Sequence, residues 1–239
     1  MPERPPSTAS ISARAAGRIS SSASAAPAGR VAHRASLDSS AEQIAARLAR
    51  VRDQVGPHVT IVAATKYVSV EDMATLAEAG IDIVGENRAQ DLEAKAEAHP
   101  GTFRWHFIGQ LQSRKVKDIA PNVRLIHSLA SDSAVRKLEE HPAKEVLVQV
   151  NVAGEEGKAG IDPDELGEFI ARCPVPVTGL MTMPPFVERA EDNRRHFARL
   201  AELAGEHGLA RLSMGTTQDY VVAAEEGATI VRLGSVLYE

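Results

Sequence analysis

The chain has 239 residues, 44% of them hydrophobic and 25% charged, which suits a globular protein with a sizeable core. Of its 27 basic and 32 acidic residues, five arginines and one glutamate lie in residues 1–36, which leaves 22 basic and 31 acidic residues in the rest. Such an acidic body excludes general nucleic-acid binding, which needs a basic surface. No apolar run approaches the ~18 to 20 residues of a membrane span, so we expect no membrane partner.

The single cysteine, Cys173, excludes an intrachain disulfide and a cysteine-based metal cluster. The lone cysteine favours a reducing, cytoplasmic setting, and we predict no metal site.

Residues 1–36 consist mainly of Ser, Ala, Arg, Pro and Gly without hydrophobic periodicity. Such a segment buries too little apolar area to offset the entropy of ordering, so we predict a disordered extension. Its Arg/Ser-rich, acid-poor composition also resembles an organellar transit peptide, and a mis-assigned start explains it equally well. We expect one ordered domain over residues 37–239.

That domain opens with a predicted helix. Asp38 or Ser39 can cap it, and apolar residues recur on one face from Ile44 to Val55. Gly56 and Pro57 end it.

Strand-like runs and helical segments then alternate along the chain. The predicted strands are Val59–Thr65, Ile81–Gly85, Phe103–Ile108, Val123–His127, Glu145–Val150, Val175–Met181, Arg211–Met214 and Thr229–Leu233. The predicted helices are Val70–Ala79, Arg88–Ala98, Ser113–Ile119, Ser133–Glu139, Pro163–Arg172, Ala190–His207 and Gln218–Glu226.

Short strands separated by helices require right-handed parallel crossovers, and eight of them predict a closed (β/α)8 barrel of the TIM type. A doubly wound open sheet is the competing architecture. We favour the barrel because the strand count is eight and no Gly-rich dinucleotide turn follows the first strand.

In such a barrel, function collects where strands end. Lys66 closes the first strand, where a lysine either extends into water or has a chemical task, because its ammonium is costly to bury. A lysine amine can form a Schiff base with a carbonyl.

Two other strand ends are typical of an anion site. Ser213 and Gly215 follow the seventh strand, and Gly234 and Ser235 follow the eighth. Barrels frequently bind a phosphate between these two loops, although each loop alone is also an ordinary turn and cap.

Arg232 interrupts the eighth strand, where its permanent charge needs an acceptor, either a carboxylate across the barrel or a ligand. Together with Lys66 and the two loops, it matches an aldehyde ligand that carries a phosphate, namely pyridoxal 5′-phosphate.

The sequence resembles the pyridoxal-phosphate homeostasis protein family, the single-domain relatives of the alanine racemase N-terminal barrel. The matching motifs are Ala63-Ala64-Thr65-Lys66, Gly85-Glu86-Asn87, Trp105-His106-Phe107-Ile108-Gly109-Gln110-Leu111-Gln112-Ser113, Val150-Asn151-Val152, Lys158-Ala159-Gly160, Gly179-Leu180-Met181, Leu212-Ser213-Met214-Gly215 and Val231-Arg232-Leu233-Gly234.

The resemblance implies a cofactor-binding barrel with the Schiff base on Lys66 and Arg232 facing the pyridine nitrogen. It also implies that Asn87 and His106 line the ring, and that the residues of the two loops after the seventh and eighth strands hold the phosphate. Lys158 resembles a family lysine near the barrel mouth, where a solvated loop lysine is the alternative.

The implied role is to bind, buffer and deliver pyridoxal phosphate, with apo-forms of the enzymes that use it as candidate partners and with no established turnover. Oligomeric state is left open, with a monomer favoured.

An arginine beside the pyridine nitrogen can only donate, so the ring stays a weak electron sink. A racemase-like enzyme of low activity and a Schiff-base aldolase stay as alternatives.

Overall fold

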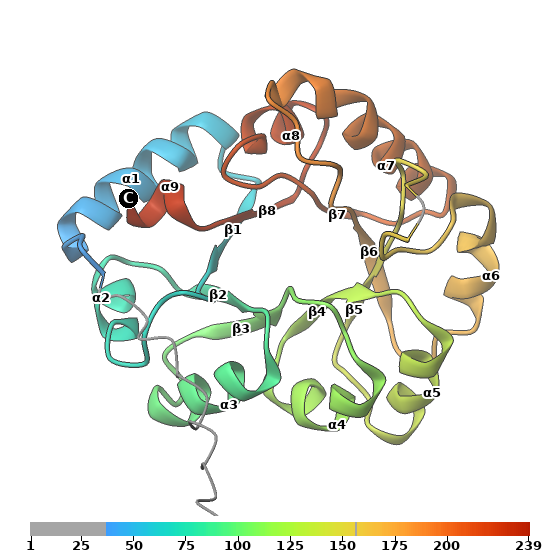
Figure 1. The fold of residues 1–239 in the computed structure, drawn as a ribbon, viewed down its shortest axis with the longest axis horizontal. Helices are drawn as coiled ribbons and strands as arrows, with labels where there is room; N and C mark the ends of the chain where they lie inside the picture. The colour runs from blue at the N-terminus through green and yellow to red at the C-terminus, as the bar shows by residue number, and fades with distance from the viewer. Residues whose placement is uncertain (1–36, 156) are drawn as a thin grey trace, which may run out of the picture. The chain divides into compact units, whose positions relative to one another are not determined.

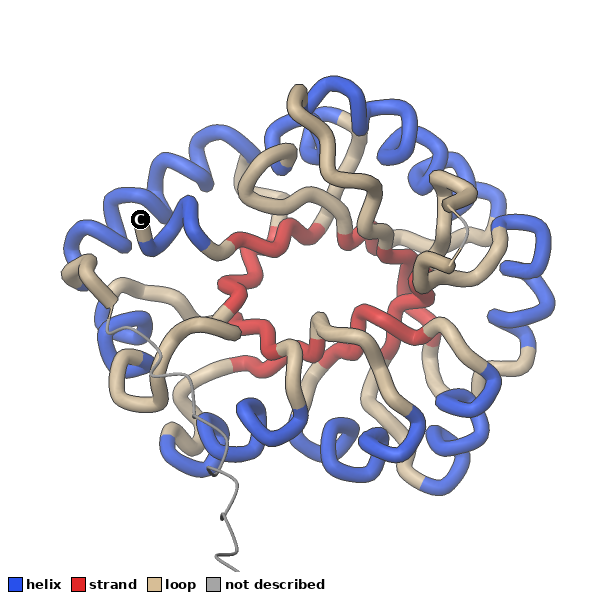
Figure 2. The backbone as a smooth tube through the Cα atoms, in the orientation of Figure 1, coloured by secondary structure: helices blue, strands red, loops and turns tan. Residues whose placement is uncertain are grey.

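The computed structural model describes residues 37–155 and 157–239, so the predicted extension over residues 1–36 lies outside the described part. Eight parallel strands, each paired with the next in chain order and the last with the first, form a closed barrel. The prediction of a (β/α)8 barrel is thereby confirmed. In the two views down the barrel, the helices surround the ring of strands (Figures 1 and 2). The strands are β1 (Thr60–Ala64), β2 (Ile83–Glu86), β3 (Arg104–Phe107), β4 (Leu125–Leu129), β5 (Val146–Gln149), β6 (Val177–Met181), β7 (Arg211–Ser213) and β8 (Ile230–Leu233).

The helices follow the predicted order, although several begin with a 3-10 turn. They are α1 (Ala41–Val55), α2 (Met73–Glu78), α3 (Ala89–Ala98), α4 (Val116–Ile119), α5 (Asp132–Glu140), α6 (Leu166–Ala171), α7 (Arg194–Glu206), α8 (Tyr220–Glu225) and α9 (Ser235–Tyr238). The sequence did not predict α9. Within the described residues, no helix is long and apolar enough to cross a membrane.

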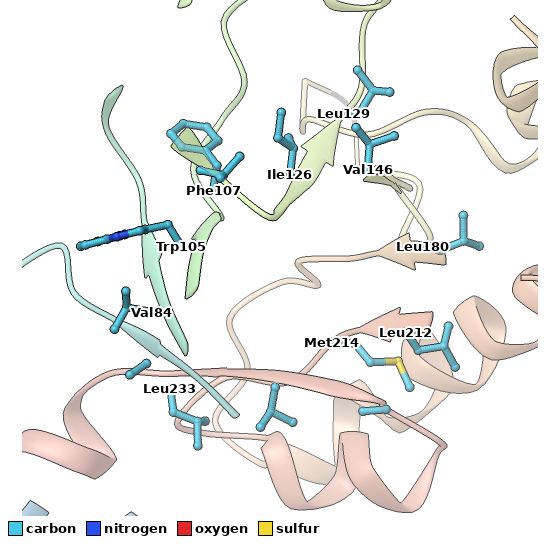
Figure 3. Packing of buried hydrophobic residues seen from close by; sticks show 14 of the residues in the cluster. Val84, Trp105, Phe107, Ile126, Leu129, Val146, Leu180, Leu212, Met214 and Leu233 are labelled. Atoms are coloured by element: carbon cyan, nitrogen blue, oxygen red, sulfur yellow. The ribbon is translucent and has the colours of Figure 1, made fainter. Parts of the chain in front are cut away.

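The strands bury both of their faces, which explains their continuous apolar runs. One face packs against the helices in a large cluster, of which Figure 3 shows Val84, Phe107 and Leu180 among others. The other face fills the barrel with a smaller apolar cluster of Val62, Ile83, Leu125, Leu147, Met181 and Ile230.

Helix α1 begins one or two residues later than predicted. Its N-cap is Ser40, whose hydroxyl accepts from the Gln43 N–H while the Gln43 side chain accepts from the Ser40 N–H. This reciprocal capping box satisfies two donors that a cap at Asp38 or Ser39 would leave open. Ser39 instead donates to the Tyr238 carbonyl at 2.6 Å, which ties α1 to α9.

The loops that follow β2 and β3 lie against each other at Gly109. A Cβ added to this glycine would come within 2.1 Å of the Asn87 carbonyl oxygen. The absence of a side chain at Gly109 therefore lets the two loops meet at one end of the barrel.

We predict that Gly109→Ala destabilises the fold by about 1 to 3 kcal/mol, because the new methyl group overlaps the backbone at Asn87. The matched control is Gly205→Ala on the exposed face of α7, where a Cβ meets nothing within 4 Å. That change should stabilise the helix by up to about 1 kcal/mol. Urea unfolding followed by circular dichroism checks both, and equal midpoints for the two variants would contradict the close approach.

Candidate ligand site at the barrel mouth

Lys66 lies at the rim, two residues beyond β1. Strand pairing matches Ala64 with Gly85, and continuing this register aligns Lys66 with Asn87. On the other side, β1 pairs with β8, so the same continuation brings Lys66 level with Val236 in α9, which begins directly after Gly234. The Lys66 side chain is exposed, and its ammonium lies 4.5 Å from the centroid of the neighbouring Tyr67 ring. Lys66 is thus accessible, between the ends of β2 and β8.

A fully buried ion pair lies directly behind Lys66. Lys95 on α3 donates to the Glu86 carboxylate and, at 2.7 Å, to the carbonyl oxygen of Thr65. The Thr65 hydroxyl donates to the same carboxylate at 2.7 Å. Since both charges are buried, each depends on the other for compensation. The network holds the backbone immediately before Lys66 and immediately before Asn87.

Asn87 is half-buried and offers an unused acceptor. Its side-chain oxygen Oδ1 is buried and has no hydrogen-bond partner in the described part of the chain. A buried amide oxygen without a donor costs free energy, so its position indicates a polar group that arrives from outside. The role of Asn87 as a residue that lines a ligand ring stays a prediction.

The loops after β7 and β8 are joined at the rim. The Gly234 N–H donates to the Thr217 hydroxyl at 3.4 Å, and the Arg232 N–H donates to the Gly215 carbonyl at 3.0 Å. Gly215 has φ +91°, where a side chain would be strained, and a Cβ there would come within 2.7 Å of Ala223. At Gly234, by contrast, an added Cβ would meet no other atom within 4 Å.

The Thr217 hydroxyl, in the predicted anion loop after the seventh strand, accepts from Gly234 and so joins the two loops. In the sequence, this residue is the second threonine of the Thr-Thr pair that follows Gly215. Ser235 is exposed, as a rim residue should be.

Arg232 is buried, and its guanidinium donates to groups at the C-terminal ends of β6 and β7. Its guanidinium donates to the Ser213 carbonyl at 2.8 Å, the Ser213 hydroxyl at 2.5 Å and the Thr182 carbonyl at 2.9 Å. Among the described residues, no carboxylate lies within ion-pair distance, so the alternative of a salt bridge across the mouth is not observed. Burial lowers the pKa of Arg232 to about 10, opposed by the charge of Asp219, and the side chain stays protonated at neutral pH.

A chain of hydrogen bonds continues from Arg232 across the barrel interior. His127 on β4 contacts the Ser213 hydroxyl through Nδ1 at 2.8 Å, and its Nε2 lies 2.9 Å from Nδ1 of His106 on β3. Burial, followed by the charges of Arg211, Arg104 and Arg124, lowers the pKa of His106 to about 4.

Burial also holds the pKa of His127 well below its usual value, with His106, Arg232 and Arg211 adding to the effect. Both rings are therefore neutral at pH 7. The sequence analysis singled out His106 but gave His127 no role.

Ser213 is fully buried, and both Arg232 and His127 bond to its hydroxyl. In this structure it belongs to the interior hydrogen-bond series, whereas Gly215 lies in the loop after β7, Gly234 directly follows β8, and Ser235 is the first residue of α9. Its predicted contact with a phosphate stays a prediction. Lys158 is exposed and its ammonium lies 3.6 Å from Glu155, as expected for a solvated loop lysine.

The site thus combines one accessible amine, a glycine- and hydroxyl-containing pair of loops, an unpaired amide oxygen and a buried cation. These groups suit a ligand that has a carbonyl for the amine and an anionic group for the loops. The fold and this rim define the class of protein, a (β/α)8 barrel of the alanine racemase N-terminal domain type, whose family model matches residues 39–239.

Relatives of known name narrow the class. The pyridoxal phosphate homeostasis protein of Aquifex aeolicus is 42% identical over 194 residues, which cover 74% of this chain and 85% of the relative. That of Vibrio cholerae is 33% identical over 225 residues, covering 85% of this chain and 95% of the relative. The chain therefore belongs to the pyridoxal phosphate homeostasis protein family.

Solved structures of related proteins share this fold. PipY of Synechococcus elongatus, in a structure with PLP bound, is 31% identical, covers 82% of this chain and 100% of its own, and superposes with a TM-score of 0.71. Alanine racemase of Corynebacterium glutamicum is 17% identical, covering 85% of this chain and 61% of its own, with a TM-score of 0.65. At that identity the likeness shows a shared fold.

We predict that Lys95→Met destabilises the protein by about 3 to 5 kcal/mol, because it leaves the buried Glu86 carboxylate without a counter-charge. Adding Glu86→Gln should recover part of the loss, since no charge then stays buried. The matched control is Lys137→Met, which breaks the exposed Lys137–Glu140 pair and should leave the unfolding midpoint unchanged. Equal urea midpoints for Lys95→Met and Lys137→Met would show that the buried pair is dispensable.

The lowered pKa of His106 also predicts a pH dependence of stability. Between pH ~6.5, where an unfolded histidine titrates, and about 4, the unfolded chain binds a proton that the folded chain does not. Stability should therefore fall as the pH drops through this window, by up to about 1.4 kcal/mol per pH unit for this ring. Urea unfolding from pH 7 to 5 measures the slope, and His106→Gln should reduce it. An unchanged slope in the variant would contradict a neutral, buried His106.

Proposed function

We propose that this protein binds pyridoxal 5′-phosphate through a Schiff base on Lys66, and that it buffers and delivers the cofactor inside the cell. The observation that carries the proposal is the placement of an accessible lysine between Asn87 and the loop at Gly234, in a chain whose family includes a relative solved with PLP bound. Homologues named for pyridoxal phosphate homeostasis support the physiological role.

The residues present fit the cofactor. The exposed Lys66 amine can reach an aldehyde, and the loops joined by Gly234 and Thr217 offer backbone N–H groups and hydroxyls to a phosphate. The buried Asn87 Oδ1 lacks a donor, which the ring hydroxyl of the cofactor can supply. Arg232 lies in the eighth strand below the same loops, and we propose that it faces the ring nitrogen.

When bound, pyridoxal phosphate supplies an electron sink for carbanions next to its imine, and its strength depends on a protonated ring nitrogen. Arg232 cannot give up a proton at neutral pH, so it keeps that nitrogen unprotonated and weakens the sink. A weaker sink disfavours transamination and decarboxylation, whereas racemisation stays possible.

The racemase-like alternative needs a second acid or base opposite Lys66. Tyr220 donates its hydroxyl to Gln54 at 2.5 Å, and Tyr238 is half-buried with a buried hydroxyl, and burial raises its pKa. Tyr67 is exposed and follows Lys66 directly. None of the three supports a second catalytic group, so turnover of a substrate stays the alternative.

Apo-forms of pyridoxal phosphate enzymes are the proposed recipients, because the cofactor of a buffer protein must pass to the proteins that use it. A cytoplasmic location is proposed from the lone Cys173, which is half-buried with its pKa raised by burial. A monomer stays the favoured oligomeric state.

Purified full-length protein incubated with pyridoxal phosphate should gain the visible absorption band of a Schiff base, and borohydride should bleach it and fix the cofactor's mass on Lys66. Lys66→Ala should lose the band, whereas Lys158→Ala, the matched loop lysine, should keep it. A wild-type protein that takes up no cofactor, or a Lys66→Ala variant that keeps the band, would overturn the assignment.

Incubation of the cofactor-loaded protein with L-alanine in deuterated water separates holding from turnover. We expect little or no deuterium at the alanine Cα by mass spectrometry. Rapid incorporation at enzyme-like rates would favour the racemase alternative instead.

A further inference from the structure

His127 has no part in the function proposed above, yet it is fully buried and engaged at both ring nitrogens. Its Nδ1 lies 2.8 Å from the Ser213 hydroxyl on β7, and its Nε2 lies 2.9 Å from Nδ1 of His106 on β3. Strands β4 and β7 are not neighbours in the barrel, so this histidine bridges the interior from one wall to another.

Arg232 determines which atom donates the proton in each of these hydrogen bonds. A guanidinium only donates, so the Ser213 oxygen must accept from Arg232 Nη1 at 2.5 Å. The single hydroxyl proton of Ser213 is then free to point at His127 Nδ1, which accepts it.

The donor at Ser213 also determines which nitrogen carries the proton in each histidine ring. A neutral imidazole carries one N–H, so a His127 that accepts at Nδ1 holds its proton on Nε2 and donates it to His106 Nδ1. His106, in turn, holds its own proton on Nε2. The reverse order would leave the Ser213 proton without an acceptor among the described residues, at a cost of about 1 to 3 kcal/mol.

The series of hydrogen bonds from Arg232 through Ser213 and His127 ends at Nε2 of His106. His106 Nε2 makes no hydrogen bond within the described residues, and it is not among their fully buried, unpaired polar atoms. The residue as a whole is 6% exposed. His106 lies one residue before the C-terminal end of β3, the end at which the mouth lies, and its Nε2 is not fully buried.

We propose that His127 is a positioning residue that locks His106 as a hydrogen-bond donor, through Nε2–H, for an acceptor atom of the ligand at the barrel mouth. His127 touches no ligand itself and acts through His106. The proton order stands on the contacts of the protein alone, whereas the role toward the ligand rests on the proposed function.

Long-range proton–nitrogen correlation spectra of the full-length protein, labelled with nitrogen-15 at histidine, test the proton order at pH 7. Spectra of His106→Gln and His127→Gln assign the two rings. We expect the proton of both rings on Nε2, and a His127 ring N–H that exchanges slowly with water because it is buried and bonded. A proton on Nδ1 of either ring, or rapid exchange at His127, would overturn the proposal whatever the variants do.

Two substitutions of His127 test the role toward the ligand, with pyridoxal phosphate as the probe. His127→Gln keeps an N–H donor near the place of Nε2, whereas His127→Leu removes it at similar volume. We expect His127→Leu to weaken binding at least about ten-fold, the loss expected for one hydrogen bond, and His127→Gln to stay within about three-fold of wild type.

Borohydride trapping on Lys66 keeps the two proposals apart. A wild-type protein that is not trapped would refute the proposed function and leave the proton order to the spectra. A trapped wild type whose affinity His127→Leu leaves unchanged would refute the role of His127 alone. If His127→Leu does not fold, the same binding comparison applies to His127→Ala, which also removes the donor at Nε2; an affinity equal to that of His127→Gln would again refute the role of His127.

Discussion

The closure of the sheet, by the pairing of β1 with β8, is the constraint on which the structure depends. It aligns Val62 with Arg232 and leaves no free strand edge, so every inward side chain shares one narrow interior. An eight-stranded barrel has room only for side chains that fill it. The apolar inner cluster therefore occupies part of the interior, and the polar side chains of the inward positions must bond to one another.

The two faces of the strands solve the problem of buried charge differently. Outside the barrel, Lys95 and Glu86 form a pair in which each charge compensates the other. Inside it, Arg232 is surrounded by carbonyl and hydroxyl oxygens, and the nearby histidines stay neutral because burial and the neighbouring cations both oppose their protonation. One arrangement fixes the backbone around Lys66, and the other leaves a net positive charge under the mouth, which suits an anionic ligand.

The sequence predicted the fold well where a local signal existed. All eight strands and the order of the helices followed from continuous apolar runs separated by helical segments, and the strand boundaries moved by three residues or fewer. Helix α9 was missed because four residues carry no periodicity, and its position depends on contacts with α1 through Ser39. The cap of α1 fell on Ser40 because Gln43, three residues on, completes a capping box.

By itself, the sequence determined the barrel, the position of Lys66 at a strand end, and the glycine and hydroxyl residues of the two loops. These features are local, because strands and helices alternate along the chain and each strand end is marked by its own residues. The tertiary structure alone decided that Lys95 reaches Glu86, that no carboxylate of residues 37–155 or 157–239 pairs with Arg232, and that His127 joins His106 to Ser213. Those contacts join side chains 9 to 86 residues apart, and only barrel closure and burial select which donor meets which acceptor.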